Sequence, residues 1–223
     1  MPGGWTMSMA WMRMPDQTWA GAAASFVGMW IVMMVAMMLP SLVPMLRRYR
    51  AAVAESGAPR LGPLTALVGA GYFFVWTLLG VAAFPLGVAL AEVEMRQPAV
   101  ARSVPIGVGV VVLLSGLLQL TRWKARHLAC CRDMPGPGRV LPARAGMAWR
   151  HGVRLGVHCV YCCAGLMAIL LVAGIMDLRA MALVTAAITV ERLAPRGERV
   201  ARVIGAVVIV AGLAVIARAA GLA

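Results

Sequence analysis

Acidic side chains are scarce in this sequence, and charged side chains of any kind make up only 13% of its 223 residues. A water-soluble protein of this size needs many more charges to cover its surface. The few charges collect in short clusters that separate long apolar runs, and the mean hydropathy is +0.85. These features exclude a soluble globular protein and predict an integral membrane protein.

Catalytic motifs are also missing. The chain has no Gly-rich phosphate-binding loop, no Ser/His/Asp set on matching helix boundaries, no pair of intramembrane carboxylates and no His-x-x-x-His pair. The first twenty residues lack a charged region followed by a clean apolar stretch and a cleavage site, so we expect no signal peptide. The sequence therefore favours a binding or handling role over an enzymatic one.

Six apolar runs predict an all-α, polytopic transmembrane helical bundle with no soluble domain. The fifth run is the shortest, and a bundle of five spans is the alternative. A single helix over 156–190 would bury Asp177 and Arg179 in the middle of the membrane, so we expect a turn there. The expected membrane domain covers 20–219, with runs at 20–45, 63–91, 104–120, 156–176, 180–194 and 200–217.

Positive charge predicts the orientation of the bundle. The net charge of +13 would suggest nucleic acid in a soluble protein, but in a membrane protein it indicates basic loops held at an anionic leaflet. With six spans, sixteen cations fall on one side and five on the other. The chain is therefore expected to cross a bacterial inner (plasma) membrane several times, with both termini outside and the basic loop 121–155 in the cytoplasm. No nucleic-acid partner is expected.

Methionine and tryptophan are concentrated near the start of the chain. Residues 1–19 are rich in both, which is typical of an interfacial segment that lies among the lipid headgroups. In the first apolar run, Met29, Met33 and Met37 recur at every fourth position, so one helix face carries a column of thioethers. Such sulfurs are soft ligands that suit Cu(I), although methionine is also a common filler of helix packing. Pro40 and Pro44 are expected to kink or end this helix.

All five cysteines fall within 34 residues, and two of the three histidines accompany them. On a helix, Cys159, Cys162 and Cys163 share one face, and His127 is related in the same way to Cys130 and Cys131. His158 precedes the second group. Both groups are predicted at the cytoplasmic boundary, so we expect them to converge on one site. The alternative is that the cysteines are ordinary small apolar residues of packed helices.

Thiolate and imidazole are the ligands that Cu(I), zinc and iron-sulfur centres prefer, and thiols facing a reducing cytosol do not form stable disulfides. The candidate metal ligands are therefore His127, Cys130, Cys131, His158, Cys159, Cys162, Cys163, Met29, Met33 and Met37. Copper is the expected ion, with zinc or an iron-sulfur centre as alternatives. Glu191 is expected to form a salt bridge with Arg192, Arg196 or an arginine of the basic loop.

Four stretches resemble a bacterial family of uncharacterised integral membrane proteins described as predicted metal-binding membrane proteins. They are GMWIVMMVAMMLPS at 28–41, KARHLACCR at 124–132, RLGVHCVYCCAGLM at 154–167 and the pair Glu191-Arg192. The resemblance extends from about Met7 to the C-terminus and implies a metal-binding membrane protein. Relatives often have cysteine where this chain has His127, which keeps a metal ligand but changes its softness.

Taken with the residues, these patterns predict a membrane protein that binds or handles a soft metal, most plausibly copper. Its partners are expected to be the lipid bilayer, the metal ion, and a membrane protein or a second copy of itself. Two other functions remain open. One is a membrane thiol-disulfide redox protein, and the other is a non-catalytic accessory subunit of a larger membrane oxidase or transporter.

Overall fold

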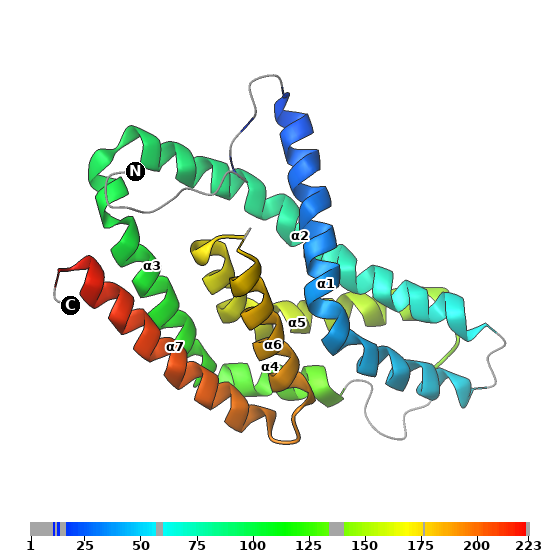
Figure 1. Cartoon of the computed structure of the whole chain (residues 1–223). Helices are drawn as coiled ribbons and strands as arrows, with labels where there is room; N and C mark the ends of the chain where they lie inside the picture. Colours follow the sequence, from blue (N-terminus) through cyan, green and yellow to red (C-terminus); the bar gives the residue numbers. More distant parts are fainter. Residues whose placement is uncertain are drawn as a thin grey trace.

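The computed structural model describes residues 11, 13, 17–56, 60–133, 141–175 and 177–221, except for the side chain at 98. Within these ranges the secondary structure consists of helices, without any strand, so the predicted all-α class is confirmed (Figure 1). The seven described α-helices are α1 Trp19–Ala54, α2 Leu61–Arg96, α3 Pro98–Gln119, α4 Arg122–Asp133, α5 Ala145–Ala173, α6 Leu178–Leu193 and α7 Gly197–Ala219.

Five of the described helices, α1, α2, α3, α5 and α7, are long and apolar enough to cross a membrane. The chain is accordingly a multi-pass membrane protein. α6 has 16 residues and is shorter than these five. It begins after the turn expected near Asp177, whose carboxylate accepts a hydrogen bond from the backbone N–H of Arg179 (2.8 Å). This side chain caps the helix and satisfies N–H groups that have no partner inside it.

α1 passes through both of its prolines and continues to Ala54, so Pro40 and Pro44 do not end it. Figure 1 shows that the helix changes direction along its course. Each proline removes one backbone hydrogen bond, and the hydroxyl of Ser41 donates to the carbonyl oxygen of Met38 (3.0 Å) in this stretch.

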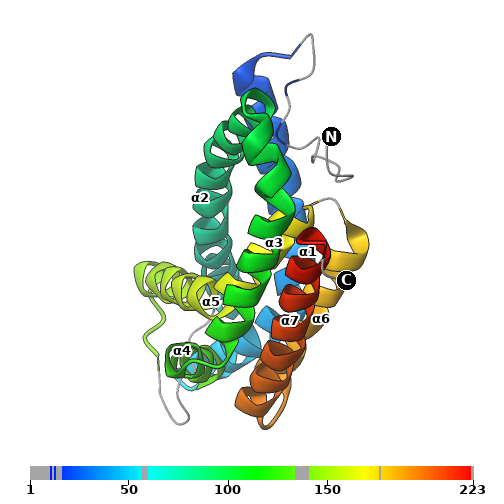
Figure 2. The same cartoon turned by 90° about the vertical axis from the view of Figure 1, so that its left-hand side faces the viewer.

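The expected basic loop contains a helix, α4, which the sequence analysis did not place. The Thr121 hydroxyl accepts a hydrogen bond from the backbone N–H of Lys124 (3.2 Å) at its first turn. Figure 2 shows α4 lying across the end of the bundle where α3 ends. The Pro-Gly repeat at 135–138 and most of the Met/Trp-rich segment 1–19 lie outside the described residues. Trp11, which is described, packs on Phe26 with ring centroids 5.0 Å apart.

Close helix packing relies on glycine at two interfaces. α7 packs on α3, where a Cβ at Gly116 would lie 2.8 Å from the backbone nitrogen of Ile209. α5 packs on α2, where a Cβ at Gly156 would lie 2.9 Å from the carbonyl oxygen of Tyr72. Small residues let backbones approach in this way, and close packing is a main source of helix association in lipid. The α2–α5 contact brings Tyr72 beside the cysteines of α5.

Backbone and arginine contacts gather several chain segments at the end where α4 lies. Arg132 of α4 donates to the carbonyl oxygen of Pro195, between α6 and α7 (3.2 Å). Arg48 of α1 donates to the carbonyl oxygen of Arg132. The backbone N–H of Leu141 donates to the carbonyl oxygen of Ala52 (3.2 Å). The end of α1, the basic loop 121–155 and the turn between α6 and α7 therefore lie together.

Candidate metal centre

Four cysteine side chains form a buried cluster, which we call the thiol tetrad: Cys131 of α4 with Cys159, Cys162 and Cys163 of α5. Each is at most 2% exposed. The sulfur of Cys162 is 3.6 Å from those of Cys131 and Cys163, and the sulfurs of Cys159 and Cys163 are 3.7 Å apart. The expectation that the two cysteine groups converge is confirmed for Cys131. All five cysteines are free thiols.

The tetrad forms because the helical repeat of α5 places three cysteines on one face and α4 places Cys131 beside Cys162. Cys159, Cys162 and Cys163 share one face of α5, and their sulfurs all lie within 4.8 Å of one another. The thiol of Cys162 also donates to the carbonyl oxygen of Cys159 (3.3 Å). α4 then delivers a fourth sulfur from a segment 28 residues earlier in the sequence.

Cys130 is separated from the tetrad although it precedes Cys131. Its sulfur lies 3.7 Å from Nε2 of His158, and the Nδ1 atoms of His127 and His158 are 3.4 Å apart. These three side chains, which we call the surface triad, are only partly buried. Trp123 and Tyr161 flank them, with ring centroids 4.6 Å and 5.0 Å from that of His127. The ten predicted ligands are thus not arranged as one site.

The methionine column lies in the same core as the tetrad. Met33 and Met37 are 5% and 2% exposed and belong to one apolar cluster with the four cysteines, while Met29 is partly buried and packs against that cluster. The cluster also contains Met34, Met38 and Met45. Thioether side chains of the first helix and the buried thiols therefore share one apolar core.

The position of Arg192 beside the tetrad was not predicted from the sequence. This residue was considered only as a partner for Glu191, but it is 3% exposed and contacts the tetrad. Its guanidinium donates to the sulfur of Cys159 (3.3 Å), the hydroxyl of Ser41 (2.9 Å) and the sulfur of Met45 (3.3 Å). The Tyr72 hydroxyl is also 2.9 Å from the sulfur of Cys159. No sequence pattern joins these residues, because they come from four helices.

Glu191 does form the salt bridge expected of it, but with Lys124 of α4, at 2.7 Å. Gln119 donates to the other carboxylate oxygen (2.9 Å), and Lys124 also donates to the carbonyl oxygen of Cys162. Both members of the ion pair are at most 3% exposed. This network joins α3, α4, α5 and α6 directly beside the thiols.

The Cys131 thiol, which α4 contributes to the tetrad, has a raised pKa. The hydrogen bond that Cys131 donates to Cys162 raises the pKa of the Cys131 thiol well above its usual value, and burial raises it further. A metal must therefore displace a proton to bind this sulfur, so its binding weakens as the pH falls. The donor set of thiols and thioethers fits a soft ion, and the dry surroundings exclude hard, water-rich ions.

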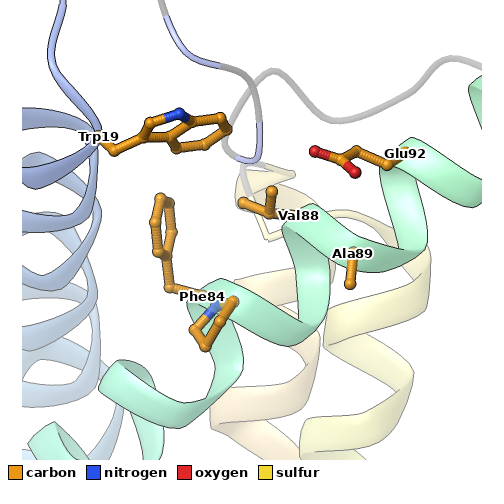
Figure 3. A pocket seen from close by; sticks show the side chains of 6 residues that line it. Trp19, Phe84, Val88, Ala89 and Glu92 are labelled. Atoms are coloured by element: carbon orange, nitrogen blue, oxygen red, sulfur yellow. The ribbon is translucent and has the colours of Figure 1, made fainter.

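A hollow of 270 Å³ between α1 and α2 lies apart from the thiols (Figure 3). Trp19, Phe84, Pro85, Val88, Ala89 and Glu92 line it. Along α2, Phe84 is twelve residues beyond Tyr72, a rise of about 18 Å. None of these described lining residues carries a sulfur or an imidazole, and none belongs to the candidate metal centre.

Comparison with known proteins identifies the family of the chain. A family model described as a copper chaperone, PpoB2, matches residues 27–215 and so covers the methionine column, the surface triad, the tetrad and Arg192. No curated protein and no solved structure matches the chain.

Proposed function

The chain belongs to the PpoB2 family of copper chaperones, and from this premise we propose that the thiol tetrad holds Cu(I) while the surface triad exchanges it with a partner protein. Copper is the cargo and the molecule is a multi-pass membrane protein. The observation that carries the proposal is the cluster of four buried, unbridged thiols, in which each sulfur lies 3.6–3.7 Å from at least one other.

The two groups of ligands suit different steps of copper handling. Buried thiols hold the ion where water and glutathione-like thiols cannot compete for it. Partly exposed imidazoles and one thiol bind more weakly and can be reached by another protein. Cys130 and Cys131 are adjacent on α4, so copper can pass from one group to the other over a short distance.

The methionines of α1 support a path for copper toward the tetrad. Met33 and Met37 are uncharged soft ligands inside the same core cluster as the thiols, so an ion can move between them without entering water. We propose that copper reaches the tetrad along the column that starts at Met29.

Labelling of Cys130 tests the surface triad. Cys130 is the most accessible thiol, so a small alkylating reagent should modify it first in the metal-free protein in detergent. Added Cu(I) should slow this reaction at least about tenfold, because a thiolate bound to metal is a poor nucleophile. His127→Ala and His158→Ala should each remove most of the protection. Mass spectrometry of the intact protein measures the label.

Equal labelling of Cys130 with and without Cu(I) would show that the triad does not bind copper. A trapped disulfide between Cys130 and another cysteine, unaffected by histidine replacement, would favour the redox alternative instead. Tyr161→Phe is the matched control, since it keeps the aromatic ring beside His127 and removes no metal ligand.

We also propose that the protein lies in a bacterial inner membrane with its basic end in the cytoplasm. The positive-inside rule supports this, because the segments gathered around α4 hold most of the arginines. A phosphatase reporter fused after Ala223 should be active, and one placed between α4 and α5 should be inactive. An inactive phosphatase after Ala223 would place the C-terminus in the cytoplasm and contradict the topology with six crossings.

A further inference from the structure

The charges buried around the thiol tetrad do not cancel. Among the described residues, three charged side chains are less than 9% exposed: Lys124, Glu191 and Arg192. Lys124 and Glu191 neutralise each other at 2.7 Å. Arg192 has no carboxylate within salt-bridge distance in the described part of the chain, so one positive charge is left over.

The unbalanced positive charge of Arg192 lies against the thiol tetrad. The guanidinium group of Arg192 donates to the sulfur of Cys159 at 3.3 Å and is held there by Ser41 and Met45. Its Nε atom has no hydrogen-bond partner among the described residues. A buried cation without a counter-charge is costly, and no described carboxylate lies close enough to Arg192 to supply one. The buried charges sum to zero when the thiol tetrad carries a single negative charge.

A single copper ion creates that charge when it binds two thiolates. When Cu⁺ replaces the protons of two thiols, two protons leave and the bis-thiolate complex has a charge of −1, which Arg192 brings to zero. Three thiolates on Zn²⁺ also give −1, but they leave the zinc without the fourth ligand of its tetrahedron, because a protonated thiol is a poor metal ligand. Three thiolates on Cu⁺ give −2, and four thiolates on Zn²⁺ also give −2. Each of these leaves the low-dielectric core with an uncompensated charge.

We propose that Arg192 is the counter-charge that makes the tetrad a site for a monovalent soft ion held by two thiolates, and that it selects Cu(I) against Zn(II). This inference rests on the proposed function. Sulfur spacing alone does not distinguish the ions, because tetrahedral zinc with bonds of about 2.3 Å needs sulfurs about 3.8 Å apart, close to those observed. Cu(I) and Zn(II) are distinguished by the net charge of the complex beside Arg192 at the number of thiolates that each ion needs.

Two substitutions of opposite sign test the inference. Arg192→Gln removes the excess charge and should weaken Cu(I) binding between about tenfold and 100-fold, whereas Arg192→Lys should stay within about threefold of the natural protein. Glu191→Gln keeps the shape of the side chain but leaves Lys124 unpaired. It should allow a third thiolate on copper and strengthen Zn(II) binding at least about tenfold.

The readouts are the Cu(I) and Zn(II) dissociation constants, from competition with chelators, and the number of sulfurs on copper, from X-ray absorption. The natural protein should show two sulfurs and Glu191→Gln three. Arg196→Gln is the matched control, because it removes an exposed positive charge next to the same helix and should change neither value. A general loss of packing would weaken both metals in both variants and would not raise the sulfur count.

Unchanged Cu(I) affinity in Arg192→Gln, or unchanged zinc affinity and sulfur count in Glu191→Gln, would overturn the inference. If Arg192→Gln does not fold, Glu191→Gln decides alone. Failure of the proposed function looks different, because the natural protein itself would then hold no more copper than a variant that lacks the four thiols.

Discussion

Serine at all four positions of the tetrad is expected to abolish copper retention by the purified protein. The natural chain should purify or reconstitute with about one Cu(I) held through dialysis against a chelator, and the serine variant with less than about a tenth of that. Serine is close in size to cysteine, but its hydroxyl is a hard ligand that is not ionised at neutral pH. The variant therefore keeps the packing of the core and loses only its affinity for soft metals.

Two variants serve as controls for this experiment. Cys130→Ser should retain the copper of the tetrad, because Cys130 faces His158 and not the buried thiols. The double change Met33→Leu and Met37→Leu should reach the same final copper content but load more slowly, since it removes ligands of the proposed path and leaves the tetrad intact. Elemental analysis gives the content, and a stopped-flow chelator assay gives the rate.

Full copper content in the serine variant would show that the cargo is held elsewhere. Equal loading rates in the methionine variant would show that the column on α1 is a packing stripe, without affecting the tetrad.

Alanine at Gly152 is expected to disrupt the fold more than alanine at any other glycine of α5. The Cβ of an alanine at this position would overlap the backbone of Val68 in α2, and a backbone cannot swing aside as a side chain can. We expect a destabilisation of about 3 kcal/mol, equivalent to about 10 °C in the melting temperature. Copper binding should fall with it, because separating α2 from α5 moves Tyr72 away from Cys159.

Gly146→Ala is the matched comparison on the same helix. A Cβ at Gly146 meets no atom of the described residues within 4 Å, and alanine is the better helix former by about 1 kcal/mol. This variant should therefore be as stable as the natural chain or slightly more so. Thermal unfolding of both proteins in detergent measures the difference. Equal melting temperatures would mean that α2 and α5 are not packed as closely as described.

The membrane class and the main helices follow from the sequence, because transfer of side chains from water to lipid dominates where a helix can form. α4 was missed for the opposite reason. Its residues are polar and basic, so hydropathy does not reveal it, and its helical form depends on a cap at Thr121 and on packing beside α5. The sequence also predicted the cysteine face of α5 correctly, since that face needs only the helical repeat.

The sequence by itself determined an all-helical membrane protein with soft ligands near one end, because composition and local spacing are enough for both. Only the tertiary structure decided how those ligands are divided. It joined Cys131 to the thiols of α5, turned Cys130 toward His158, paired Glu191 with Lys124 and left Arg192 unpaired against Cys159. These contacts link residues 28 to 67 positions apart, and their geometry depends on how closely the glycines of α2, α3, α5 and α7 let the helices approach.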